Sequence, residues 1–244
     1  MQADTPILVA QGLHKRFGAL VVLDGVSLSI GEGEALGIVG PNGAGKTTLL
    51  SVLAGAQAPD AGSIRFKNDD VTTLGAPARC RRGLARTHQI PRPFSGMTVF
   101  ENVYVAASQA GGANGEAAYD IATDALAQCG MLRLANRPAE TLGLLARKRL
   151  ELARALATRP SLLLLDEIGG GLTNAEAGEL VDTIRELRRR GISIVWIEHI
   201  VHVLVQVAER LICMDAGRII ADGTPQRVLS DAGVVAAYLG GVPA

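Results

Sequence analysis

Short apolar or alternating stretches near the start of the chain predict β-strands. Residues 7–9, 26–30 and 35–39 show this pattern, with glycine-rich turns between them. Residues 63–66 alternate polar and apolar side chains, which favours an edge strand. Residues 48–54 follow the third stretch and have the composition of a helix that ends at a glycine. The chain therefore begins with strands and continues into a strand–loop–helix unit.

Beyond about Gln89 the pattern becomes helical. Residues 117–129 are rich in strong helix formers and end at a glycine. Residues 146–158 predict a second helix, followed by a proline. We therefore predict a mostly helical insertion over residues 89–154.

Strands and helices alternate again after the insertion. Residues 162–165 and 193–197 predict buried strands, and Thr173 with Glu176 predicts a capping box that opens a helix. One face of that helix is apolar, with Ala177, Leu180, Val181, Ile184 and Leu187. Such alternation is typical of an α/β protein with a mostly parallel sheet and functional loops at the carboxyl ends of its strands.

Composition limits the classes of protein to consider. The chain has 244 residues, of which 48% are hydrophobic, enough for one substantial domain. Its formal net charge of +0 argues against a nucleic-acid partner. Its three cysteines show no metal or disulfide spacing, which favours a reducing cytosol. No apolar run approaches the roughly 20 residues that span a bilayer, so work at a membrane would require another chain as anchor.

The strongest chemical signal lies between the strand at 35–39 and the helix at 48–54. The segment fits the pattern G-x-x-x-x-G-K-[ST] and reads Gly40-Pro41-Asn42-Gly43-Ala44-Gly45-Lys46-Thr47-Thr48. A glycine-rich loop can turn its N–H groups around an anion, and the following helix directs its positive dipole end to the same point. Lys46 suits the β- and γ-phosphates, and the Thr47 hydroxyl suits Mg²⁺. The sequence therefore predicts a nucleoside triphosphate bound with Mg²⁺.

Two carboxylates directly follow the four-leucine strand at 162–165. At a strand tip they can face the phosphate loop on the neighbouring strand, so Asp166 is a candidate Mg²⁺ ligand. Glu167 is a candidate general base for an attacking water. The alternative is a pair of solvated acids, which the apolar strand upstream makes less attractive.

A histidine and a glutamine are weaker candidates. His199 follows the strand at 193–197 and could donate a hydrogen bond to the γ-phosphate, although a lone histidine there is more often a surface residue. Gln89 lies where the core meets the insertion and could contact metal or water. His14 and His202 have no such placement and stay unassigned.

These motifs occur in the order and spacing of ATP-binding-cassette (ABC) ATPases, which the chain resembles over nearly its whole length. Within that family it is most similar to the importer ATPases for branched-chain amino acids. The stretches that carry this likeness are Ala85-Arg86-Thr87-His88-Gln89, Met97 to Val103, Leu150-Glu151-Leu152-Ala153-Arg154, Ile197-Glu198-His199, Asp222-Gly223-Thr224-Pro225 and Ala237-Tyr238-Leu239-Gly240.

The resemblance implies a P-loop ABC ATPase fold, with a mostly parallel core sheet, an antiparallel β subdomain and a helical insertion. It divides the single domain 1–244 into a nucleotide-binding core at 1–88 and 155–244 and a helical subdomain at 89–154. The cofactors would be ATP and Mg²⁺, with catalytic Glu167, His199 and Lys46 and metal contacts from Thr47, Gln89 and Asp166. Phe17 would stack on the adenine.

The resemblance also implies partners and a location. The chain would form a head-to-tail dimer, with a different ABC ATPase favoured over a second copy, and would be held by permease subunits at the cytoplasmic face of the membrane. A solute-binding protein would act indirectly. Two alternatives remain: an ATP-gated regulatory dimer with negligible hydrolysis, and a soluble ABC ATPase outside transport.

The chain departs from the family in its signature, Leu-Ser-Gly-Gly-Gln. The matching stretch is Leu142-Gly143-Leu144-Leu145-Ala146, which lacks the serine and the glutamine and carries bulk at a glycine position. In the family this segment caps ATP held by the opposite subunit. Either the N–H groups of the helix that begins near Ala146 suffice, or an intact partner makes the dimer asymmetric, and we favour asymmetry.

Arginines and lysines gather in three short clusters, for which a solvated face is the default expectation. They are Arg79 with Arg81, Arg82 and Arg86; residues 147–149; and residues 188–190.

Overall fold

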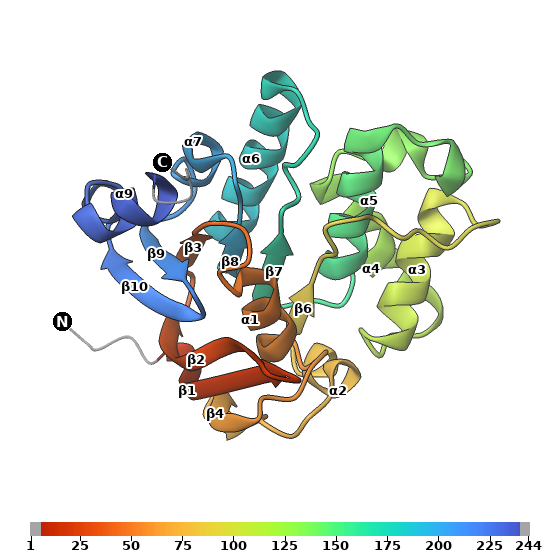
Figure 1. The fold of residues 1–244 in the computed structure, drawn as a ribbon. Helices are drawn as coiled ribbons and strands as arrows, with labels where there is room; N and C mark the ends of the chain where they lie inside the picture. Colours follow the sequence, from red (N-terminus) through yellow and green to blue (C-terminus); the bar gives the residue numbers. More distant parts are fainter. Residues whose placement is uncertain (1–5, 240–244) are drawn as a thin grey trace.

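The computed structural model describes residues 6–239; residues 1–5 and 240–244, including Gly240 of the closing motif, lie outside the described part. Two sheets organise the described chain, and helices cover both (Figure 1). The antiparallel sheet has the order β2-β1-β4-β5. Its strands are β1 (Pro6–Phe17), β2 (Leu20–Gly31), β4 (Ala61–Phe66) and β5 (Asp69–Asp70).

The first two strands are longer than the sequence pattern predicts, because they pair with each other along most of a hairpin. The edge position expected for residues 63–66 is wrong. Strand β4 lies between β1 and the two-residue strand β5, which pairs Asp69 and Asp70 with Phe66 and Arg65. Its alternation therefore reflects one buried face rather than an edge.

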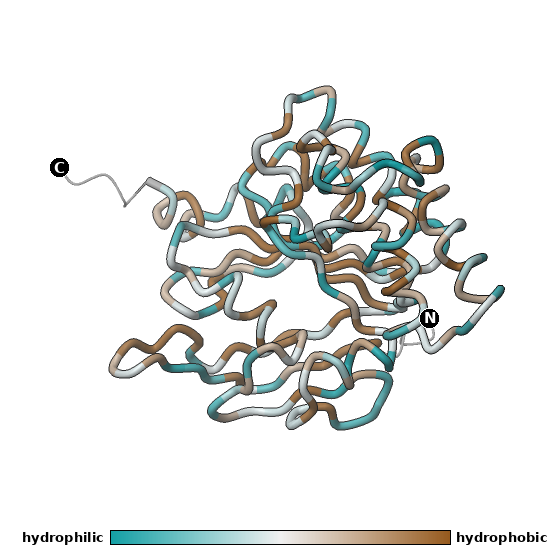
Figure 2. Tube along the Cα trace, turned by 90° about the vertical axis from the view of Figure 1, so that its right-hand side faces the viewer, coloured by the Kyte–Doolittle hydropathy of each residue, from teal (hydrophilic) through white to brown (hydrophobic). Residues whose placement is uncertain are grey.

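The core sheet has six strands in the order β10-β9-β3-β8-β7-β6. The strands are β3 (Ala35–Val39), β6 (Leu84–Arg86), β7 (Leu162–Asp166), β8 (Ser193–Ile197), β9 (Arg210–Asp215) and β10 (Arg218–Gly223). All neighbours pair in parallel except β10 with β9. Every residue of β3, β7 and β8 is buried, and Figure 2 shows these hydrophobic strands crossing the middle of the molecule. The predicted mostly parallel sheet is confirmed.

Alternate residues of one strand supply two hydrophobic cores, one on each face of the core sheet. Leu162 and Leu164 of β7 pack in a core with α1 (Lys46–Leu53) and the antiparallel sheet. Leu163 and Leu165 point to the other face and join the core beneath the larger helices. This alternation is the two-residue period of a strand, and it explains why all four leucines are buried.

Three helices pack together beside the core sheet: α3 (Val99–Gln109), α4 (Gly115–Gln128) and α5 (Leu144–Leu156) (Figure 1). We call them the helical region. Helices α4 and α5 begin and end within two residues of the predicted bounds. Helix α3 opens with a capping box of Thr98 and Glu101, a signal that the sequence analysis did not use.

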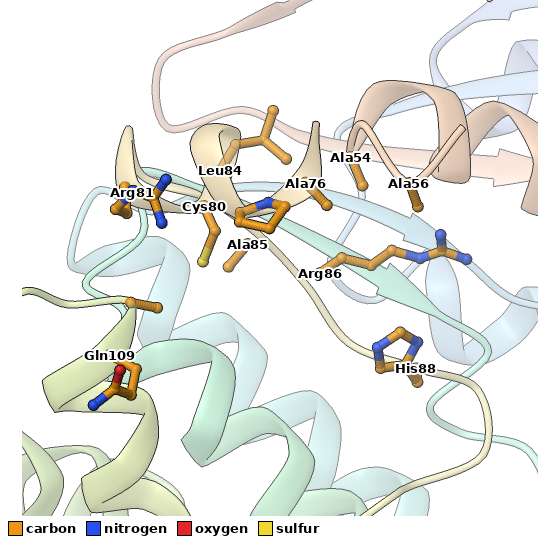
Figure 3. A pocket seen from close by; sticks show the side chains of 12 residues that line it. Ala54, Ala56, Ala76, Cys80, Arg81, Leu84, Ala85, Arg86, His88 and Gln109 are labelled. Atoms are coloured by element: carbon orange, nitrogen blue, oxygen red, sulfur yellow. The ribbon is translucent and has the colours of Figure 1, made fainter. Parts of the chain in front are cut away.

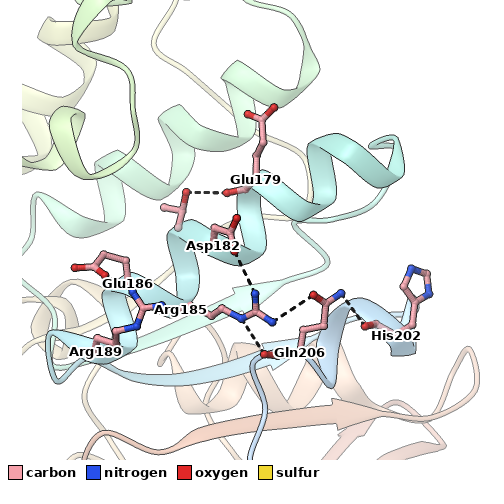
Figure 4. Close-up of polar contacts among 8 residues, drawn as sticks. Glu179, Asp182, Arg185, Glu186, Arg189, His202 and Gln206 are labelled. Atoms are coloured by element: carbon pink, nitrogen blue, oxygen red, sulfur yellow. Dashed lines mark hydrogen bonds and ion pairs between the residues drawn. The ribbon is translucent and has the colours of Figure 1, made fainter.

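The capping box of Thr173 and Glu176 is confirmed at the start of α6 (Asn174–Arg189), and the five predicted apolar residues of that helix are buried. Its outer side carries charged side chains (Figure 4). Arg185 donates to the Gln206 carbonyl at 3.1 Å and contacts Asp182, and Gln206 donates to the carbonyl of His202. These bonds join α6 to α7 (Val201–Leu204).

Shorter elements complete the described chain. They are α2 (Ala76–Arg81), the 3₁₀ turns Leu132–Leu134 and Ala139–Thr141, α8 (Pro225–Leu229) and α9 (Ala232–Leu239). None of the helices within residues 6–239 has the length and apolarity needed to cross a membrane.

Candidate functional site

The glycine-rich loop joins β3 to α1, as predicted. Gly40 has φ +143°, and a Cβ there would lie 2.1 Å from the Met214 carbonyl oxygen, so no larger residue fits. Gly45 caps α1 with φ +98°. The Lys46 ammonium is buried and donates to the carbonyls of Gly40 at 2.7 Å and Pro41 at 2.9 Å. Burial lowers the pKa of Lys46, and the nearby Glu167 carboxylate opposes that shift.

A cavity of about 280 Å³ opens over this loop. Its walls come from the loop, the start of α1, the β2 hairpin arm and the tip of β7, and they comprise Asn42 to Thr48, Leu20, Val22 and Glu167. The cavity thus brings together the loop and Glu167, which are separated by some 120 residues of sequence. A helix N-terminus and loop N–H groups at its floor make it an anion site.

Asp166 ends β7 and is 2% exposed. We expected the carboxylates at the tip of the strand next to the one that leads into the loop. This expectation is wrong, because β8 lies between β7 and β3. Arg86 of β6 donates to Asp166 Oδ2 at 2.7 Å and to the Ser51 hydroxyl of α1 at 2.8 Å. The solvated face expected for Arg86 is therefore wrong, because this side chain ties β7 to the helix that follows the loop.

The other carboxylate oxygen of Asp166, Oδ1, is buried and has no hydrogen-bond partner. A buried carboxylate oxygen without a partner is costly unless a ligand satisfies it. No group of three His, Cys, Asp or Glu side chains that could hold a metal occurs within residues 6–239. Mg²⁺, however, is usually held by one or two protein oxygens together with phosphates. Asp166 and the exposed Thr47 at the cavity wall fit such an ion.

Every polar group of Glu167, in the backbone and in the side chain, has a polar partner. Its backbone has φ +48°, a left-handed conformation that costs a non-glycine residue about 1–3 kcal/mol. Its N–H donates to the Ile197 carbonyl at 2.9 Å. Gln89 Nε2 donates to Oε2 at 2.5 Å, and His199 Nε2 lies 2.7 Å from Oε1. The structure therefore brings together the three residues predicted from separate segments.

Two buried ionisable side chains support the loop after Glu167, and no sequence pattern had indicated either of them. Glu198, 2% exposed, accepts the Gly169 N–H at 2.5 Å. Burial raises the pKa of Glu198. Lys148 of α5, 3% exposed, donates to the Glu167 carbonyl at 3.4 Å, and burial lowers its pKa. The solvated face expected for residues 147–149 is wrong at Lys148.

Arg79 is a second arginine that is not solvated, in a cluster that was expected to be. It is 1% exposed and lies beneath the carboxyl end of α1. Its guanidinium donates to four backbone carbonyls, those of Leu74, Val52, Leu53 and Thr72. Because two of these acceptors end α1, Arg79 fixes the far end of the helix that begins in the loop.

Comparison with known proteins decides the family. The family model described as "ABC transporter" matches residues 23–169, more than half of the chain. The chain belongs to the ABC transporter ATP-binding proteins. A second model, "Branched-chain amino acid ATP-binding cassette transporter", matches residues 218–244.

Curated ABC relatives align over almost the full chain. A high-affinity branched-chain amino acid transport ATP-binding protein of Pseudomonas aeruginosa, BraF, is 34% identical over 96% of this chain and 98% of its own. The corresponding protein LivG of Escherichia coli is 36% identical over the same shares. An export ATP-binding protein for lipopolysaccharide, LptB of Haemophilus influenzae, is 32% identical over 96% of this chain and 97% of its own.

Solved ABC cassettes share the fold. The ADP conformation of the cassette MJ1267 superimposes with a TM-score of 0.89 at 32% identity, covering 97% of this chain and 99% of that one. A nucleotide-free cassette has the same TM-score, covering 96% and 99%. The predicted ABC ATPase fold is confirmed, and so is the assignment as an ATP-binding, ATP-hydrolysing transport subunit.

The altered signature segment of this ABC protein differs from the expectation in one respect. Helix α5 begins at Leu144, two residues earlier than predicted, with Gly143 as an N-cap that offers no side-chain bond. Leu144 is 46% exposed, and a Cβ on Gly171 would lie 3.1 Å from its Cδ2. An apolar side chain thus packs against the loop after β7 where the family places small residues.

Phe17 lies at the tip of the β1–β2 hairpin. It is 47% exposed, and the Lys15 ammonium lies 5.7 Å from the centre of its ring. The residues of this hairpin that line the loop cavity are Leu20 and Val22. Phe17 therefore belongs to the hairpin that borders the cavity but does not line the cavity itself. Its contact with adenine stays a prediction.

Proposed function

We propose that this protein is the ATP-hydrolysing subunit of an importer for branched-chain amino acids or similar small polar solutes. The names of the relatives BraF and LivG and the family model at 218–244 support the substrate class. The observation that carries the catalytic role is Glu167, placed at the wall of the loop cavity and held at both carboxylate oxygens. Relatives named as transport proteins over nearly the whole chain do not favour a soluble ABC ATPase or a regulatory dimer.

The loop and its neighbours would bind Mg·ATP. The N–H groups of residues 40–48 would surround the phosphates, and Lys46 would release its two loop carbonyls to pair with the β- and γ-phosphates. Thr47, Asp166 and Gln89 would contact Mg²⁺ directly or through water. The ion would neutralise charge that develops on the phosphate oxygens.

Glu167 would orient and deprotonate the attacking water. Gln89 and His199 fix its carboxylate from two sides, which restricts its rotamers before substrate arrives. The His199 side chain is 47% exposed and lies against Glu167 at the cavity wall, and it would also donate to the γ-phosphate. Phe17 would stack on the adenine from the hairpin tip.

The permease subunit would dock between the core (residues 1–88 and 155–244) and the helical subdomain (residues 89–154). A cavity of about 520 Å³ lies there, between α2, β6 and the end of α3 (Figure 3). Apolar side chains line it together with Arg81, Arg86 and His88. Cys80 also lines it and offers a site for cross-linking to a permease in membranes at the cytoplasmic face.

The partner ATPase would be a different chain. Leu144 and Leu145 stand where the family has glycines, so the N-terminus of α5 offers neither a hydroxyl nor close backbone approach to a nucleotide. Losing one hydrogen bond to a charged phosphate would cost about 1.5–3 kcal/mol. An intact signature on the partner would still cap the ATP held by this chain. A solute-binding protein would deliver solute to the permease.

The test combines two substitutions with a complete transporter. Lys46→Ala is expected to abolish Mg·ATP binding measured by calorimetry. Glu167→Gln is expected to keep binding, to lower turnover by about 10²–10⁴-fold and to trap an ATP-bound dimer. Unchanged hydrolysis in Glu167→Gln would refute the base, and full activity of this chain alone would refute dependence on a partner's signature.

A further inference from the structure

We propose that Tyr238 is a positioning residue for the phosphate loop: its hydroxyl accepts the Gly40 N–H and fixes the first residue of the loop. The distance from Gly40 N to the hydroxyl oxygen is 2.8 Å, across 198 residues of sequence. The inference rests on nucleotide binding at this loop and adds a contact from the C-terminal helix.

Gly40 is the point at which the loop leaves the sheet. Its carbonyl accepts from Lys46, its N–H donates to Tyr238, and its left-handed backbone packs against the Met214 carbonyl of β9. A nucleotide that draws Lys46 to its phosphates removes the bond at the carbonyl. Tyr238 then becomes more important, because its bond to the N–H does not have to break.

The start of α9 explains how the tyrosine reaches the loop. Asp231 accepts the N–H groups of Gly233 at 2.8 Å and Val234 at 3.2 Å, which stabilises the first turn. Val234 is 2% exposed and anchors the helix in the core. Tyr238 follows four residues later on the same face, so burying Val234 directs Tyr238 inward toward the loop.

The hydroxyl, rather than the ring, carries the function. Tyr238 as a whole is 44% exposed, so its ring contributes only part of the packing, while the hydroxyl meets a backbone donor. Burial raises the pKa of this phenol, and the Gly40 N–H opposes that shift. The group is therefore neutral at physiological pH and acts as a plain acceptor for the Gly40 N–H.

Tyr238→Phe tests this because it removes one oxygen and keeps the ring. Calorimetry with Mg·ADP is expected to show a Kd raised about three- to tenfold, the value of one hydrogen bond. Hydrogen exchange at the Gly40 amide is expected to accelerate. Tyr119→Phe, at a tyrosine of α4 that is 56% exposed, is the matched control and is expected to change neither quantity.

Equal Kd and equal exchange in Tyr238→Phe and wild type would overturn the inference. A lower melting temperature with unchanged Kd and exchange would overturn it too, because that result describes packing of α9 alone. Failure of the wild-type protein to bind nucleotide would instead overturn the proposed function, and this inference with it.

Discussion

Arg79 gives a prediction whose size can be worked from the structure. Its guanidinium is buried, with donor–acceptor distances of 2.9 Å to Leu74, 2.8 Å to Val52, 2.7 Å to Leu53 and 3.0 Å to Thr72. Hydrogen bonds from a charged donor contribute about 1.5–3 kcal/mol each, or roughly 6–12 kcal/mol for four. Burial opposes this gain. It lowers the pKa of Arg79 to about 10, which means that the buried site disfavours the charged guanidinium by roughly 3 kcal/mol.

We therefore expect Arg79→Met, which keeps most of the stem but removes every donor, to lower the free energy of unfolding by at least about 3 kcal/mol. The melting temperature of a chain of this size would fall by about 6–12 °C. The melting temperature of Arg79→Lys is expected to lie between those of wild type and Arg79→Met. An ammonium can reach some of the four carbonyls but not those on both sides of the guanidinium.

Urea unfolding followed by the fluorescence of Trp196 measures this loss. Trp196 is the only tryptophan of the chain and is 1% exposed in β8, so its emission reports the core sheet. Arg81→Met, an exposed arginine of the same helix, is the control and is expected to stay within about 0.5 kcal/mol of wild type. An Arg79→Met protein that unfolds within about 1 kcal/mol of wild type would refute the reasoning.

Two further predictions concern buried ionisable groups. Burial raises the pKa of Glu198, so the stabilisation from its protonated form is present below the unfolded value of 4.5 and is lost as pH rises through the folded pKa. Glu198→Gln keeps an acceptor for the Gly169 N–H without the charge, and its melting temperature relative to wild type is expected to rise as the pH increases above 4.5; a constant difference would contradict this. Burial raises the pKa of all three cysteine thiols, to about 12 for Cys129 and to about 11 for Cys213. Cys129 and Cys213 are buried, whereas Cys80 is partly exposed and lines a cavity, so a thiol reagent at neutral pH is expected to modify only Cys80 in the native protein and all three cysteines after denaturation. Fast modification of more than one thiol in the native state would show that the core opens.

Local signals were enough to predict the centre of the site. The strand at Ala35–Val39, the glycine loop and the helix after it are contiguous, and each follows from the residues themselves. The same holds for the strand that ends in Asp166 and for the capping box of α6. In these segments hydrophobic pattern, turn residues and caps all favour one structure.

The supporting contacts could not be predicted, because they join residues far apart in the sequence. Arg86 meets Asp166 across 80 residues, and Lys148 of α5 meets the Glu167 carbonyl across 19 residues, with β7 between them. Periodicity identifies the buried face of an element but not the partner that covers it, so charged side chains in short basic runs looked solvated. The position of β8 between β3 and β7 is likewise a property of strand order, which no local pattern contains.

The contacts of Lys46 change what an affinity for nucleotide means in this protein. In the conformation described, its ammonium is satisfied by two oxygens of its own loop. The loop thus acts as an intramolecular competitor of the phosphates, and a measured Kd reports the difference between two sets of partners for one cation. A substitution that weakens the hydrogen bonds between Lys46 and these two carbonyls is accordingly expected to lower the Kd for nucleotide, even though it adds no contact to the nucleotide.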